Sequence, residues 1–152
     1  MKVTKSKNME EKWKMTDKWP DEEGFISEGE IVSLFKATGT IAKGKLVYLT
    51  GDLEIQQAVL DCDPIGVALK DAVNGDYVPI CIHGVCKVLA GAAITRGKAI
   101  KSDANGKAIP LADQAVNEGG TGTYTIYYAR KAGIALQAAA ADGDYILAFV
   151  CK

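Results

Sequence analysis

The segment from Cys81 to Cys86 could do chemistry, because its two thiols flank His83, the single histidine of the chain. Thiolate and imidazole groups bind zinc, and together they form the nucleophile and base of cysteine hydrolases. Alternation along a strand would put Cys81 and His83 on one face and Cys86 on the other, unless the intervening glycine forms a bulge. Cys62 or Cys151 could complete a set of four zinc ligands, but nothing in the sequence places either of them near this segment. We therefore expect buried strand cysteines and predict no catalytic residue, no metal and no cofactor.

Acidic residues form two pairs that could bind a cation, Asp61 with Asp63 and Asp52 with Glu54. Each pair flanks the end of an expected strand, where acidic residues commonly form solvated turns. The glycine-rich segment 119–122 lacks the Lys-Ser/Thr of a phosphate-binding loop, and no helix is expected to begin there. These segments are therefore interpreted as turns, which places the function in surfaces rather than in a reaction centre.

The composition is that of one globular domain. The length is 152 residues, 48% of them hydrophobic and 24% charged, which suits a single packed core. The net charge of −1 creates no field that would attract nucleic acid or an anionic membrane, so neither is an expected partner. Sixteen glycines against four prolines indicate many tight turns between short extended segments. The prediction is an all-β chain.

Neither end of the sequence looks like a signal or a membrane anchor. The N-terminal segment has no apolar stretch typical of a secretory signal. The most apolar segment, 132–151, carries Asp142 and Asp144 near its middle, which a membrane span could not bury cheaply. We therefore expect the chain to be made in a cytoplasm, where its four cysteines stay reduced.

Residues 1–30 are expected to form an extended arm, and residues 31–152 the domain. The first 24 residues are rich in charge and poor in aliphatic side chains, yet they hold both tryptophans, Trp13 and Trp19. Large apolar groups on a solvated segment are costly unless something covers them. Trp13 and Trp19 are therefore candidate partner-binding residues, and Pro20 next to Trp19 indicates an extended backbone there. An equally weighted alternative is that the tryptophans fold back onto their own domain.

From residue 24 onward, short apolar runs alternate with glycine turns. The pattern predicts strands at 31–37, 45–50, 64–69, 77–82, 85–89 and 124–129. Asn74-Gly75 and 103–106 have the composition of turns. Residues 111–118 could form a short helical turn, but a long loop insertion is favoured because a flexible glycine-rich turn follows.

The second half of the sequence repeats the first. The matching segments, in order, are 41–47 with 94–100, 65–69 with 132–136, and 75–78 with 143–146. Three matches in the same order indicate two related β units in one small barrel or sandwich, each supplying about half of the strands. Residues 132–141 have the intrinsic propensity of a helix. Their counterpart predicts a strand followed by a loop instead.

The order of these motifs resembles a known family. The segments 44–49, 64–72, 75–80, 83–88 and 94–100 together are similar to the small β-barrel capsid decoration (cement) proteins of tailed bacteriophages. The resemblance covers residues 40–150. It implies a non-enzymatic virion protein on the capsid exterior, which binds the expanded head, commonly as a homotrimer. Its expected partners are the major capsid protein and itself, and it would hold neighbouring capsid subunits together.

The charged arm departs from the simplest members of that family. By similarity with decoration proteins whose termini add to a capsid sheet, Trp13, Trp19 and Phe25 would anchor the arm to a neighbouring subunit or a capsid loop. Three alternatives remain: a virion tail or fibre component, a ligand-binding barrel, and a small trimeric β nucleotide hydrolase. The hydrolase is disfavoured, because the sequence lacks the acidic residue and glycine-rich tail motif that would surround a phosphate-bound metal.

Overall fold

The computed structural model describes residues 31–112 and 130–151 and confirms the all-β fold. The strands in these ranges are β1 (Ile31–Ala37), β2 (Leu46–Gly51), β3 (Glu54–Gln57), β4 (Pro64–Ala68), β5 (Tyr77–Leu89), β6 (Ala99–Ser102), β7 (Ala108–Pro110), β8 (Gly133–Ala135) and β9 (Tyr145–Val150). Across the same ranges there is no helix of the length and apolarity needed to cross a bilayer. The arm and the segments expected at 113–118 and 124–129 lie outside the described residues.

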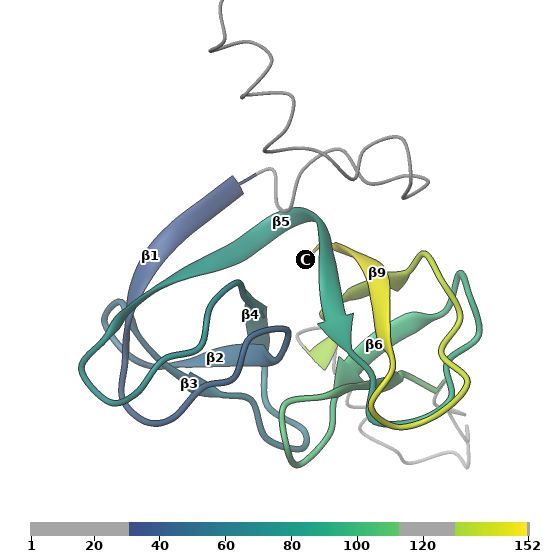
Figure 1. Cartoon of the computed structure of the whole chain (residues 1–152), viewed down its shortest axis with the longest axis horizontal. Helices are drawn as coiled ribbons and strands as arrows, with labels where there is room; N and C mark the ends of the chain where they lie inside the picture. The colour runs from purple at the N-terminus through teal and green to yellow at the C-terminus, as the bar shows by residue number, and fades with distance from the viewer. Residues whose placement is uncertain (1–30, 113–129, 152) are drawn as a thin grey trace, which may run out of the picture.

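The first five strands close into a barrel (Figure 1). The circuit runs β1–β3–β2–β4–β5 and returns to β1, because β5 pairs antiparallel with β1 as well as with β4. Strands β1 and β3 are parallel, and the other pairs in the circuit are antiparallel. Closure removes most of the exposed strand edges that an open sheet would leave.

The long strand β5 continues from this barrel into a second set of strands (Figure 1). Its second half pairs with β9, which is followed across the sheet by β8, β6 and β7. A parallel bridge between Ala90 and Ala108 completes the circuit. The expectation of two separate strands at 77–82 and 85–89 is therefore wrong. Gly84 has a φ of +117°, a backbone conformation that glycine adopts readily. This conformation lets the strand change direction without leaving the sheet.

The two units are built alike, which confirms the predicted pseudo-repeat. An antiparallel bridge joins Ile41 to Ala72 in the first unit, and Ile94 to Ala139 in the second. The same correspondence holds for hydrogen bonds: Gly44 N donates to Ala68 O at 2.8 Å, and Gly97 N donates to Ala135 O at 2.7 Å. Likewise Gly75 N donates to Ala37 O, and Gly143 N to Ala90 O, both at 2.8 Å. Residues 132–136 contain a strand and not a helix, because these backbone bonds override helix propensity.

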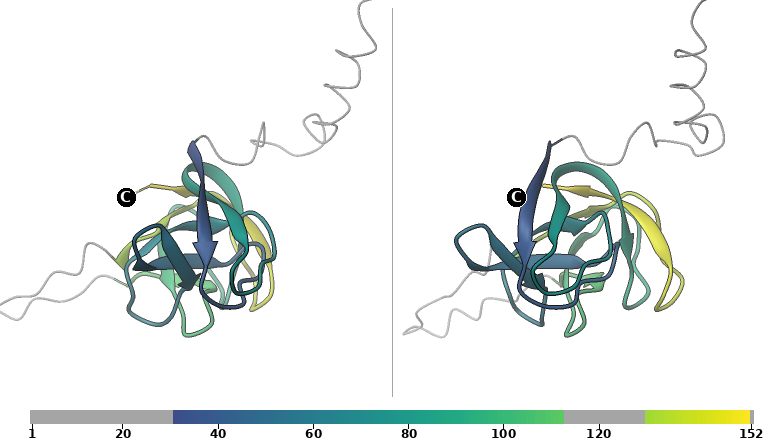
Figure 2. Two further views of the ribbon diagram at one scale, coloured as in Figure 1. Left: turned by 90° about the vertical axis from the view of Figure 1, so that its left-hand side faces the viewer. Right: turned by 60° about the vertical axis from the view of Figure 1, so that its left-hand side comes forward.

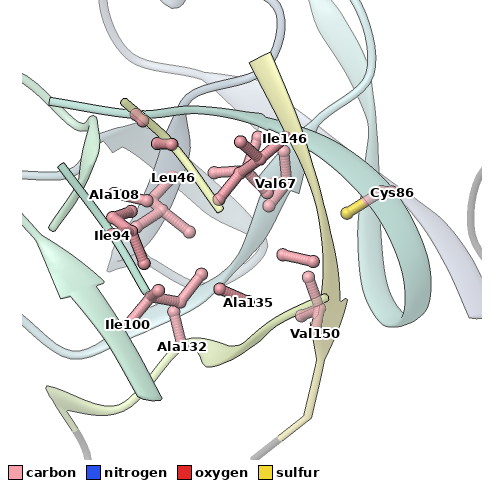
Figure 3. Packing of buried hydrophobic residues seen from close by; sticks show 14 of the residues in the cluster. Leu46, Val67, Cys86, Ile94, Ile100, Ala108, Ala132, Ala135, Ile146 and Val150 are labelled. Atoms are coloured by element: carbon pink, nitrogen blue, oxygen red, sulfur yellow. The ribbon is translucent and has the colours of Figure 1, made fainter. Parts of the chain in front are cut away.

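Each unit surrounds its own buried core. The first core consists of Phe35, Ala37, Ile41, Val47, Ile55, Ala68, Ala72, Val78 and Ile80. The equivalent positions of the second unit are also buried, in the same order: Val88, Ala90, Ile94, Ile100, Ala108, Ala135, Ala139, Ile146 and Ala148. Several of the second set are smaller. The first unit fills the difference, because Leu46 and Val67 lie in the second core, among Ile94, Ala108 and Ile146 (Figure 3).

The sequence gives no signal for strands β3 and β7. Residues of β3 include two glutamines, and β7 has three residues and ends in proline, so neither is a β-branched or aromatic run. Long-range pairing holds them instead: β3 lies between β1 and β2, and β7 pairs with β6. The expected turn at 103–106 is confirmed as the connection between β6 and β7.

Equivalent glycines allow a close crossing of strands in each unit. A Cβ at Gly66 would press against the carbonyl oxygen of Cys81, and one at Gly133 against that of Phe149. We expect Gly66→Ala and Gly133→Ala each to lower the free energy of unfolding by about 1–3 kcal/mol, because a backbone carbonyl cannot move aside cheaply. Denaturant unfolding monitored by circular dichroism measures this change.

Gly39→Ala is the matched control for these two variants. Its Cβ would meet only the flexible side chain of Gln56, at 3.2 Å from Nε2, so the unfolding midpoint should stay close to that of the unaltered protein. Unchanged midpoints for Gly66→Ala and Gly133→Ala would contradict the close crossings.

Candidate partner-binding surface

The cysteines and the histidine of β5 are packing residues. Cys81 and Cys86 are both fully buried in one core cluster, and the Cys81 thiol donates a hydrogen bond to the carbonyl oxygen of His83 at 3.6 Å. The prediction that Cys86 faces away from Cys81 is wrong, because a register shift between Cys81 and His83 and the positive φ of Gly84 break the alternation. The His83 ring meets Phe149 edge-on, with centroids 5.1 Å apart. Over residues 31–112 and 130–151 no three His, Cys, Asp or Glu side chains are grouped to hold a metal ion.

Two of the four acidic residues considered for cation binding, Asp61 and Glu54, contact basic side chains. Asp61 Oδ1 lies 3.3 Å from Lys101 Nζ and 3.2 Å from Arg130 Nη1, which links the connection between β3 and β4 to the second unit. Glu54 pairs with Lys36 at 3.5 Å across the parallel strands β3 and β1. These pairs are partly solvated, so each contributes little to stability. They support the interpretation of these carboxylates as surface and turn residues.

One ion pair of the second unit shifts a pKa. Lys107 Nζ donates a hydrogen bond to Asp142 Oδ1 at 2.7 Å, which joins the turn before β7 to the turn before β9. This hydrogen bond raises the pKa of Lys107 above its ordinary value and outweighs the opposing effect of desolvation. The lysine is thus held in its charged form, as a structural contact between two turns.

A group of exposed apolar side chains surrounds β1. We define the β1 surface as the exposed side chains of Ile31, Val32, Leu34, Leu53 and Tyr77. Leu34, Leu53 and Tyr77 are exposed by 63%, 68% and 70%. Strand pairing brings them together, because Lys36 lies opposite Tyr77 on β5 and beside Glu54 on β3, next to Leu53. Exposed apolar side chains that cluster in this way are typical of an interaction site.

The first half of β1 extends beyond the barrel (Figure 2). Residues 31–34 are exposed on both faces of the strand, although β5 pairs with them along one edge. Pairing of β1 with β3 is limited to Lys36 and Ala37, so among the described residues no strand pairs with the other edge at 31–34. An apolar strand with an open edge offers backbone hydrogen bonds as well as side chains to a partner.

The partner-binding residues predicted from the sequence belong to the arm. Trp13, Trp19, Pro20 and Phe25 lie outside the described residues, so their role stays a prediction. The arm leads directly into β1 along the chain.

The residues of the β1 surface were missed as candidates by the sequence reasoning. The sequence offers one signal, because Leu53 stands where the second unit has Gly106, the residue type expected in a turn. The structure gives Leu53 a φ of +58°, which is unusual for leucine. The apolar run at 31–35 also lacks the alternation of a half-exposed strand.

The fold is similar to that of a solved phage protein. The chain resembles the N base of head fiber gp8.5 from bacteriophage phi29, with a TM-score of 0.58 and 23% sequence identity. The similarity covers 80% of this chain and 93% of the other. At this level of identity the likeness establishes the fold. Among curated proteins, no sequence matches the chain.

Comparison with protein-family models gives a match over most of the chain. The model for phage cement protein matches residues 26–150, which include every strand described above. This range also contains the whole segment whose motifs resembled decoration proteins. The chain therefore belongs to the phage cement protein family.

Proposed function

We propose that the protein is a non-enzymatic decoration protein that binds the outer surface of the expanded phage head as a trimer. It stabilises contacts between major capsid subunits there. Family membership supports association with the head. The single structural observation that supports a role in contacts between subunits is the β1 surface, where apolar side chains and an open strand edge lie on an otherwise closed barrel.

The physical basis of such a role is contact area repeated over a symmetric shell. A protein that bridges capsid subunits needs a rigid spacing between its contacts. Each contact can be modest, because several contacts made together by one assembly give a high overall affinity for the shell. Two fused barrels provide the rigid spacing. The arm extends the reach: its tryptophans can fill pockets on a neighbour, and a segment next to β1 can add to a strand edge.

A second candidate function is the base of a fibre on the head. The observation that favours it is the fold shared with a head fiber base. Both functions place the protein on the head and require no chemistry. Electron micrographs of virions distinguish them: a compact knob on the capsid supports decoration, and a knob that carries a longer projection supports a fibre base.

Removal of residues 1–24 tests the role of the arm. We expect the truncated protein to keep its β-rich circular dichroism spectrum, because every described strand lies after this segment. Its binding to purified expanded heads should weaken, since two aromatic anchors are lost. Co-sedimentation with heads, quantified as copies bound per head, measures the effect. Full binding by the truncated protein would refute a role for the arm.

Substitution of the tryptophans tests the anchors separately from the length of the arm. Trp13→Ala and Trp19→Ala should each weaken head binding by about 2 kcal/mol, or roughly 30-fold, as expected for buried aromatic anchors. The double variant Lys5→Ala and Lys7→Ala is the control, and should bind as the unaltered protein does at moderate ionic strength. Equal losses in both sets would indicate a charge effect and argue against aromatic anchoring.

A further inference from the structure

The contact between the two units is a template for a contact between chains. Within the chain, Leu89 N donates to Gly44 O, and Leu46 N donates to Gly106 O, both at 2.8 Å. The ring of Tyr145 lies against Gly44, where an added Cβ would come within 2.7 Å of a ring carbon. Leu46 is fully buried in the core of the second unit (Figure 3).

This contact joins two different surfaces. The first unit contributes Gly44, Leu46 and Ala58, and the second contributes Leu89, Gly106 and Tyr145. The repeat places equivalents of each set in the other unit. Gly97, Ala99 and Leu111 of the second unit correspond to the first set, and Lys36, Leu53 and Tyr77 correspond to the second. Each chain therefore carries a second copy of each surface, one on either unit. These two copies correspond to the pair of surfaces that meet inside the chain.

The equivalent surfaces are open where the originals are covered. Gly44 is buried, but Gly97 is exposed and an added Cβ there would have no atom within 4 Å. Leu46 is fully buried, whereas Ala99 is half-buried. Tyr77 is more exposed than Tyr145, at 70% against 58%. The ring of Tyr77 could thus cover Gly97 of another chain as Tyr145 covers Gly44.

Side-chain sizes are exchanged between the two surfaces. Inside the chain, the large Leu46 meets the small Gly106. On the open surfaces the positions are reversed, since the equivalent of Leu46 is Ala99 and the equivalent of Gly106 is Leu53. The Lys36 amide donates to Leu53 O at 3.0 Å, within its own unit. The equivalent amide of Leu89 instead donates to Gly44 O in the other unit, so this backbone bond would not recur between chains. The side chains of Leu53 and Tyr77 would therefore carry a contact between chains.

We propose that copies of this chain associate head to tail, with the β1 surface of one copy covered by the β6 face of the next. The β6 face consists of Gly97, Ala99 and Leu111 together with Ile134, which lies opposite Ala99 across β6 and β8. A contact between two different surfaces closes into a ring when its rotation permits. The proposal rests on the trimer of the proposed function and names the surfaces that form it. It does not depend on binding to the head.

Solution mass of full-length variants tests the interface. Leu53→Lys on the β1 surface and Ala99→Lys on the β6 face should each convert the trimer to a monomer in light scattering after size exclusion. A lysine would bring an unpaired charge into the apolar contact. The control is Leu60→Lys, an exposed leucine on the connection between β3 and β4, which should remain trimeric. Tyr77→Lys and Leu111→Lys serve as second variants on each surface if melting shows that the first ones are unfolded.

Mixing the variants tests the head-to-tail arrangement itself. Leu53→Lys keeps an intact β6 face and Ala99→Lys keeps an intact β1 surface, so an equimolar mixture should form dimers in sedimentation velocity while each alone stays monomeric. Folded variants that remain trimeric would overturn this interface and leave the trimer standing. An unaltered protein that is monomeric at all concentrations would also overturn it and remove the trimer from the proposed function, whereas binding of that monomer to heads would still support head decoration.

Discussion

Strand β5 is the constraint on which the rest of the molecule depends, because it forms a wall of both barrels. Its first half pairs with β1 and β4, and its second half pairs with β9. Neither barrel can shift without breaking hydrogen bonds of a strand that the other also uses. Gly84 makes this sharing possible, since its positive φ turns the strand between the two circuits while pairing continues on both sides.

The shared strand brings the units together, and the distribution of side-chain sizes makes one depend on the other. Phe35 and Ile55 fill the first core, where the second has Val88 and Ala108. The second core is completed by Leu46 from the first unit. Loss of this side chain would leave a cavity in the second core, and cavities lower stability. The first unit fills its own interior and still presents apolar side chains to solvent at its outer end.

This arrangement suits a protein that works by contact. Closed barrels pair most backbone groups internally, so few strand edges remain to be managed at the surface. One edge that stays open among the described residues is that of β1 at 31–34, within the β1 surface. Asp61 and Cys81, two residues considered above for chemistry, have structural contacts.

The sequence by itself determined the fold class, the two-unit repeat and the positions of β1, β2, β4 and β8, because these depend on local patterns of apolar residues and glycine turns. It also pointed to the family through the order of those motifs. Only the tertiary structure decided that β5 is continuous, that Cys81 and Cys86 share a core, and that β3 and β7 are strands. It alone identified the β1 surface. The physical reason is that these features arise from pairing between residues distant in the chain. A backbone bend at Gly84, or a leucine at position 53 where the second unit has Gly106, changes which side chains are covered.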